Sequence, residues 1–95
     1  MDSIIKVPDL MEFWNDNRGA LPLCRILSQG RIDKIKVQLR KYPDWDHWAE
    51  AIEAFTSSSF CRDQWKPGFD EFLTESKRIR AIEGMYADRP MRMAR

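Results

Sequence analysis

The chain carries few side chains of the kinds that catalyse reactions or ligate metals. His47 is the single histidine, and the two cysteines, Cys24 and Cys61, lie far apart in the sequence. A zinc-type site needs several ligands at short spacings, and His47 has no cysteine or second histidine within a helical turn. Neither cysteine has a neighbouring base that would activate a thiolate. We therefore expect no catalytic residue, no metal and no cofactor, and we expect His47 to lie exposed on the surface.

The other candidate groups for catalysis have ordinary structural explanations. The carboxylates Asp46, Glu50 and Glu53 repeat at helical spacing, which is typical of a solvated helix face. The serines at 57–59 lack the pattern of a nucleophile elbow, and the glycines are too scattered for a phosphate-binding loop. A chain of 95 residues without these signatures is predicted not to be an enzyme and to have no small-molecule substrate.

Basic and acidic residues are segregated along the chain, although the net charge is only +1. The stretch 18–41 holds seven bases and one acid, whereas the stretch 42–75 holds two bases and eight acids. Such segregation either gives two surfaces of opposite sign or brings basic and acidic helices together across the fold. The sequence is compatible with both arrangements.

Helical spacing recurs along the chain, and no long stretch alternates as a strand would. We predict helices over 8–15, 28–41 and 45–56, a fourth from about residue 68, and a last one over 75–85. The connector 20–26 is expected to be partly buried, and 60–68 to be irregular. The fold class is therefore all-α, a compact small domain of four to five short helices. Its predicted parts are a flexible N-terminus (1–7), a single helical domain (8–86) and a basic C-terminal tail (87–95).

Several residues mark the ends of these helices. Asp44 after the end of one helix is a good N-cap for the next. Gly19 and Gly84 suit a left-handed conformation at helix C-termini. The large rings at helical spacing predict an aromatic core. The predicted core residues are Trp14, Trp45, Trp48, Phe55, Phe60, Trp65, Phe69 and Phe72.

The segment 28–41 separates an apolar face from a basic one. Ile32, Ile35 and Leu39 form the apolar stripe. Polar side chains on its other side, together with bases of the last helix, are the candidate contact residues for nucleic acid or for a protein partner. These candidates are Arg31, Lys34, Gln38, Lys41, Lys77, Arg78 and Arg80.

Composition also bears on the compartment in which the chain works. No apolar run approaches the roughly 20 residues that a bilayer span needs, and the first residues do not form a signal peptide. Two distant cysteines are typical of a protein held together by packing in a reducing setting. We therefore expect a cytoplasmic protein without membrane association.

The region 58–86 carries a more specific pattern. It combines Ser-x-Phe at 58–60, Trp65, Phe69-Asp70 and an Ile-Glu-Gly-x-Tyr ending at 82–86. This pattern resembles the C-terminal region of bacteriophage and prophage DNA replication proteins of the replisome-organiser and helicase-loader type. Cys61 departs from it, since leucine is usual there. Upstream, Glu12-Phe13-Trp14-Asn15 and the helix from Arg31 to Leu39 also look like the same module. The family-motif residues, most of them expected to be structural, are Trp14, Ser58, Phe60, Trp65, Phe69, Asp70, Gly84 and Tyr86.

The resemblance implies a non-enzymatic protein-interaction module that engages a replicative helicase or a replication initiator. Two alternatives stay open. One is direct nucleic-acid binding, to DNA in particular, through the basic helix 28–41. The other is a small phage-encoded inhibitor of a host protein.

Overall fold

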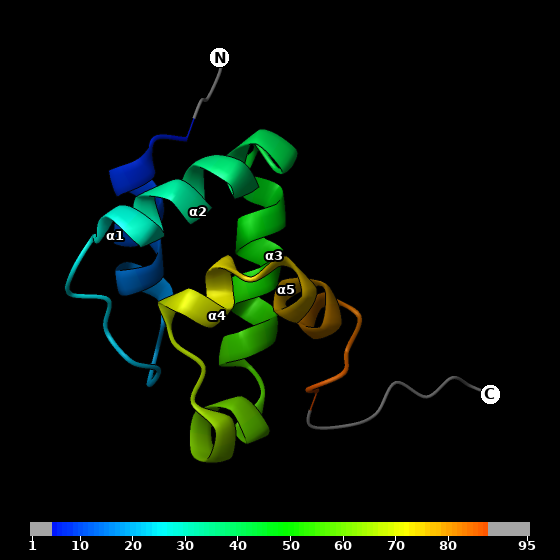
Figure 1. The fold of residues 1–95 in the computed structure, drawn as a ribbon. Coiled ribbons are helices and arrows are strands. Elements are labelled where there is room, and N and C mark those ends of the chain that lie inside the picture. Colours follow the sequence, from blue (N-terminus) through cyan, green and yellow to red (C-terminus); the bar gives the residue numbers. More distant parts are fainter. Residues whose placement is uncertain (1–4, 88–95) are drawn as a thin grey trace.

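The structure, a computed structural model, describes residues 5–87. Over this range the chain is all-α and contains no strand. Its elements are α1 (Val7–Asn17), α2 (Gln29–Lys41), α3 (Trp45–Thr56), the π-helix η1 (Cys61–Trp65), α4 (Phe69–Leu73) and α5 (Glu75–Ile82). Figure 1 shows α3 upright in the centre, with α2 across its upper end, α4 and α5 across its middle, and the π-helix below. None of the described helices is both long and apolar enough to cross a membrane.

The helix ends follow the local signals in the sequence. The side chain of Ser28 accepts a hydrogen bond from the N–H of Arg31 at 3.3 Å, so α2 begins one residue after it. Asp44 accepts from the N–H of Asp46 at 3.1 Å and caps α3, as predicted. Gly19 and Gly84 take positive φ values of 60° and 89°, which confirms the two left-handed helix ends.

The N-terminal boundary differs slightly from the prediction. Helix α1 begins at Val7, and Ile5 is buried in the core, so residues 5–7 belong to the folded part. The carboxylate of Asp9 accepts a hydrogen bond from the N–H of Lys6 at 3.2 Å, which favours this early start. The remainder of the predicted flexible terminus (1–4) and all but the first residue of the predicted tail (88–95) lie outside the described residues.

The core is aromatic and centres on Phe72. The ring centroids of Trp14 and Trp48 lie 5.0 Å and 5.4 Å from that of Phe72, and all three side chains are fully buried. Phe55 and Phe69 are buried beside them, as predicted. Each ring removes about 150–250 Å² of surface from water, so these five side chains dominate the apolar burial.

Three of the predicted core rings lie further out. Trp45 and Trp65 are only half-buried at the edge of the core. The prediction that Phe60 is a core residue is wrong, because 43% of it is exposed. Ser58 and Cys61, three residues apart, take the inward positions of this turn, so Phe60 between them faces outward.

The connector between α1 and α2 is held against α1 by side chains of that helix. The N–H of Cys24 donates to Oδ1 of Asn15 at 2.8 Å, and Nδ2 of Asn15 donates to the carbonyl of Cys24 at 2.9 Å. The indole of Trp14 donates to the carbonyl of Pro22 at 2.9 Å. Leu21 and Cys24 are buried, which confirms that the connector is partly buried.

Candidate interaction site

The basic face of α2 lies against the acidic residues of α4 and α5. The guanidinium of Arg31 binds the carboxylate of Asp70 through Nε at 2.9 Å and Nη2 at 3.2 Å. Nζ of Lys41 binds Oε1 of Glu75 at 2.8 Å. Hydrogen bonds from Arg31 and from Lys41 lower the pKa of Asp70 and of Glu75, respectively. Basic and acidic segments therefore pair across the fold at these two positions.

Arg31 is fully engaged within the chain. Besides its bond to Asp70, it donates through Nη1 to the carbonyl of Ile26 at 2.7 Å, and the same nitrogen lies 3.5 Å from Sγ of Cys24. Its guanidinium also lies 5.9 Å from the ring centroid of Phe69. An arginine bound in this way has little capacity left for a phosphate, which would have to displace a bidentate carboxylate.

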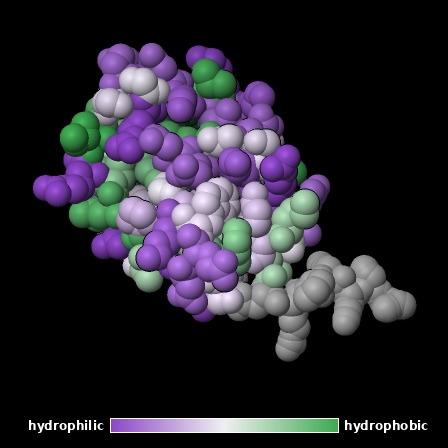
Figure 2. All heavy atoms as spheres, turned by 60° about the horizontal axis from the view of Figure 1, so that its bottom comes forward, coloured by the Kyte–Doolittle hydropathy of each residue, from purple (hydrophilic) through white to green (hydrophobic). Residues whose placement is uncertain are grey.

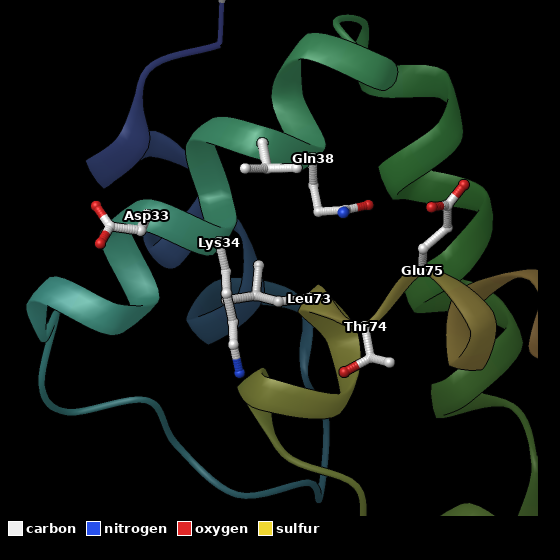
Figure 3. A pocket seen from close by; sticks show the side chains of 7 residues that line it. Asp33, Lys34, Gln38, Leu73, Thr74 and Glu75 are labelled. Atoms are coloured by element: carbon white, nitrogen blue, oxygen red, sulfur yellow. The ribbon is translucent and has the colours of Figure 1, made fainter.

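A groove of about 380 Å³ lies between the two ion pairs. It runs between α2 and the junction of α4 with α5, and Figure 3 shows the side chains around it. Val37 is 44% exposed here, while the buried Leu73 belongs to the wall. The lining residues are Asp33, Lys34, Val37, Gln38, Leu73, Thr74 and Glu75.

Two hydrogen-bond donors of the groove, Lys34 and Gln38, come from α2, while the hydroxyl of Thr74 donates to the carbonyl of Asp70. Oε1 of Gln38 accepts a hydrogen bond from Arg78, which leaves the amide NH₂ as the group available to a ligand. Lys34 is exposed, and no carboxylate among residues 5–87 lies within ion-pair distance of its ammonium. In Figure 3 its side chain extends from α2 beside Leu73. The groove thus combines an apolar contact with an ammonium that is in no salt bridge within the described part of the chain, although its charge helps to lower the pKa of Asp70.

Arg78, expected on the surface, is instead fully buried. Nε donates to Nε2 of His47 at 2.8 Å, Nη1 donates to the carbonyl of Phe72 at 2.9 Å, and Nη2 donates to Oε1 of Gln38. Its guanidinium lies 4.3 Å from the ring centroid of Trp48. Three acceptors and an indole face replace the water that the cation loses, which is how a charged side chain persists in this core. Arg78 therefore cannot contact a partner.

The expectation that His47 is an exposed surface residue is also wrong. Its ring is half-buried and stacks on Tyr42, with centroids 3.8 Å apart and planes 10° apart. Burial first, and the positive charge of Arg78 second, lower the pKa of His47 to about 4. Burial lowers the pKa of Arg78 to about 10, so at neutral pH the arginine is charged and the imidazole is neutral. A neutral imidazole has the lone pair that accepts the N–H of Arg78.

The two remaining candidate bases lie away from the groove. Lys77 packs beside Trp65, with Nζ 5.4 Å from the ring centroid, and Arg80 is exposed further along α5. The seven residues nominated from the sequence therefore do not form one surface. Lys34 and Gln38 line the groove, while the other bases pair internally, lie buried or belong to another part of the molecule.

Ser58, Trp65 and Tyr86, which are far apart in the sequence motif, lie close together in the fold. The hydroxyl of Ser58 donates to the carbonyl of Tyr86 and accepts from the N–H of Cys61 at 3.1 Å, and Ser58 is fully buried. The ring of Tyr86 packs 4.9 Å from that of Trp65. These contacts hold Tyr86 against the turn after α3, so Ser58 has a structural role.

The sequence did not predict several residues that line the groove, or Tyr42, which binds one of them. Val37, Thr74 and Glu75 were not nominated, because nothing local distinguishes an exposed valine or a helix-starting threonine. Tyr42 donates to Oε2 of Glu75 at 2.7 Å across 33 residues, a contact without a local signal. No group of three or more histidine, cysteine or acidic residues in the described range could hold a metal ion.

Comparisons of the chain with protein-family models, with curated proteins and with solved structures found no match. Function is therefore inferred from the arrangement of the residues themselves, and the groove between α2 and the α4–α5 junction is a candidate site among the described residues.

Proposed function

We propose that the chain is a non-enzymatic protein-interaction module associated with phage-type DNA replication. In this proposal it engages a replicative helicase or a replication initiator through the groove between α2 and the α4–α5 junction. The groove carries the interaction part of the proposal, because it presents exposed Val37 beside the unpaired ammonium of Lys34. The resemblance of residues 58–86 to phage replication proteins supports the replication context.

The fixed geometry of the groove favours binding over a merely solvated helix face. The Arg31–Asp70 and Lys41–Glu75 ion pairs join the two walls at either end. The buried Arg78 donates a hydrogen bond to the side-chain carbonyl of Gln38 and so orients that side chain. A site whose walls are already ordered loses less conformational entropy when a partner binds. A partner that fits places an apolar side chain on Val37 and a carboxylate on Lys34.

Binding of nucleic acid along α2 is less well supported than protein binding. A phosphate track needs several cations free on one face. Two of the α2 bases nominated for such a track, Arg31 and Lys41, are instead paired with carboxylates, and Arg78 is buried. The acids of α4 and α5 that pair with them would also repel a phosphate backbone.

Titration of the chain with a purified bacterial replicative helicase and with a purified replication initiator tests this proposal. We expect one of them to bind, and we expect V37D and K34E each to weaken that binding at least tenfold. K36E is the matched control, because Lys36 is exposed on α2 but does not line the groove. The proposal fails if neither protein binds, or if K36E weakens binding as much as K34E does.

A further inference from the structure

A second surface lies at the opposite end of α3 from the α2–α3 turn, where aromatic side chains reach the exterior. The ring of Phe60 lies 6.2 Å from that of Trp65 and 6.1 Å from that of Tyr86, centroid to centroid. These rings continue outward from Phe55, which is fully buried and stacks on Tyr86. Phe60 is still 43% exposed, so the row begins in the core and ends in solvent. We call Phe60, Trp65 and Tyr86 the aromatic end.

The backbone that presents these rings is unusual. Residues Cys61–Trp65 form a π-helix, a rare conformation that is frequent at functional sites. Lys66 ends it with φ +55°, a left-handed conformation that costs free energy in a residue other than glycine. The N–H of Lys66 donates to the carbonyl of Cys61 at 2.7 Å and fixes the turn. Phe60 and Lys66 therefore flank the π-helix as its N-cap and C-cap residues.

One cation contacts the aromatic end, and a second follows Trp65 in the sequence. Nζ of Lys77 lies 5.4 Å from the ring centroid of Trp65, and Lys66 is exposed beside that residue in sequence. The acids near these rings in sequence are Asp63 and Glu83, and the bases are Arg62, Lys66 and Lys77, so bases outnumber acids there by one. Figure 2 views the molecule from this side and shows pale and green residues lying between hydrophilic ones.

We propose that the aromatic end binds single-stranded nucleic acid. A base stacks on the exposed ring of Phe60, and the flanking phosphates bind Lys66 and Lys77. Alternation of a stacking ring with cations is the arrangement that binds single strands, because every base has a π-face and every nucleotide a phosphate. Binding is insensitive to base sequence, since neither contact reads a base edge. This site does not depend on the groove or on the protein partner proposed for it.

Fluorescence anisotropy with a labelled oligothymidylate of about 12 nucleotides tests the proposal, since single-strand sites span about 4–16 nucleotides. The titration is repeated at two salt concentrations and with a DNA duplex of the same length. F60L keeps an apolar side chain and removes the ring. K77Q and K66N each remove one charge, and asparagine tolerates the left-handed backbone at 66. K36Q and R40Q on α2 are matched controls for loss of charge, because both side chains are exposed and neither lines the groove.

We expect the oligothymidylate to bind more tightly than the duplex and to weaken as salt rises. F60L is expected to weaken binding about tenfold, the loss of roughly one stacked base. K77Q and K66N are each expected to reduce the slope of log affinity against log salt by about 0.7. Absence of binding at low salt would overturn the proposal. So would tighter binding to the duplex, or losses in K36Q and R40Q as large as those in K77Q and K66N. Thermal unfolding shows whether F60L remains folded. If F60L is unfolded, the change in salt dependence of K77Q tests the proposal instead.

Discussion

Stability should fall as the pH is lowered below 6.5, because His47 is held neutral in the fold. Its pKa is lowered from 6.5 to about 4, so protons bind the unfolded chain before they bind the folded one. Well above pH 6.5 the imidazole is neutral in both states, and its contribution to stability is fully present. That contribution is lost progressively as the pH falls towards 4, and below about 4 this group causes no further change.

The size of the effect follows from the shift and from the exposure of the ring. The full shift corresponds to about 3 kcal/mol at 1.4 kcal/mol for each pH unit. Because the ring of His47 is only half-buried, solvent screening reduces this to about 1–2 kcal/mol. Asp70 and Glu75 also have pKa values lowered from 3.8 and 4.5, so their contribution is lost mainly below about pH 5. The interval from pH 6.5 to 5 therefore reports mainly on His47.

Urea unfolding followed by tryptophan fluorescence, at several pH values between 7 and 5, measures this slope. H47Q is the comparison, because glutamine places an acceptor near the position of Nε2 and does not titrate. We expect the wild-type free energy of unfolding to fall over this interval and that of H47Q to stay nearly constant. Equal slopes in the two proteins, or a flat wild-type profile, would show that His47 does not lie in the environment described here.

Two further substitutions test the buried polar contacts. R78M keeps an apolar stem but leaves His47, Gln38 and the carbonyl of Phe72 without their donor. Urea unfolding should show that the free energy of unfolding falls by about 3 kcal/mol. A fall of less than about 0.5 kcal/mol would mean that water replaces the guanidinium at little cost. S58A removes the hydrogen bonds to Tyr86 and Cys61 and should cost about 1–3 kcal/mol, with T56S, at a half-buried neighbour that keeps its hydroxyl, as the control.

The helices could be predicted where apolar spacing and end signals agreed. Helix α3 begins after Asp44 and ends at Thr56, as the stripe of large apolar residues and its N-cap indicated. Helix α2 was predicted within one residue for the same reason. These features are local, since a cap and a turn of helix involve only neighbouring residues.

The candidate site was less predictable, because its contacts join residues far apart in the sequence. An arginine on an amphipathic helix normally lies at the surface, and nothing near Arg78 indicates otherwise. The acceptors that allow its burial include Gln38 and His47, which lie 40 and 31 residues away. Charge segregation predicted either pairing or opposed surfaces, and only the packing of α2 on α4 brings Arg31 to Asp70.

Burial of Arg78 makes the assembly of the helices cooperative. Its guanidinium takes acceptors from α2, α3 and α4 while belonging to α5 itself. If any one of these helices were undocked, a cation would be left dehydrated and short of an acceptor, a state of high free energy. Partly docked intermediates are therefore penalised, and the small domain should gain or lose these four helices together.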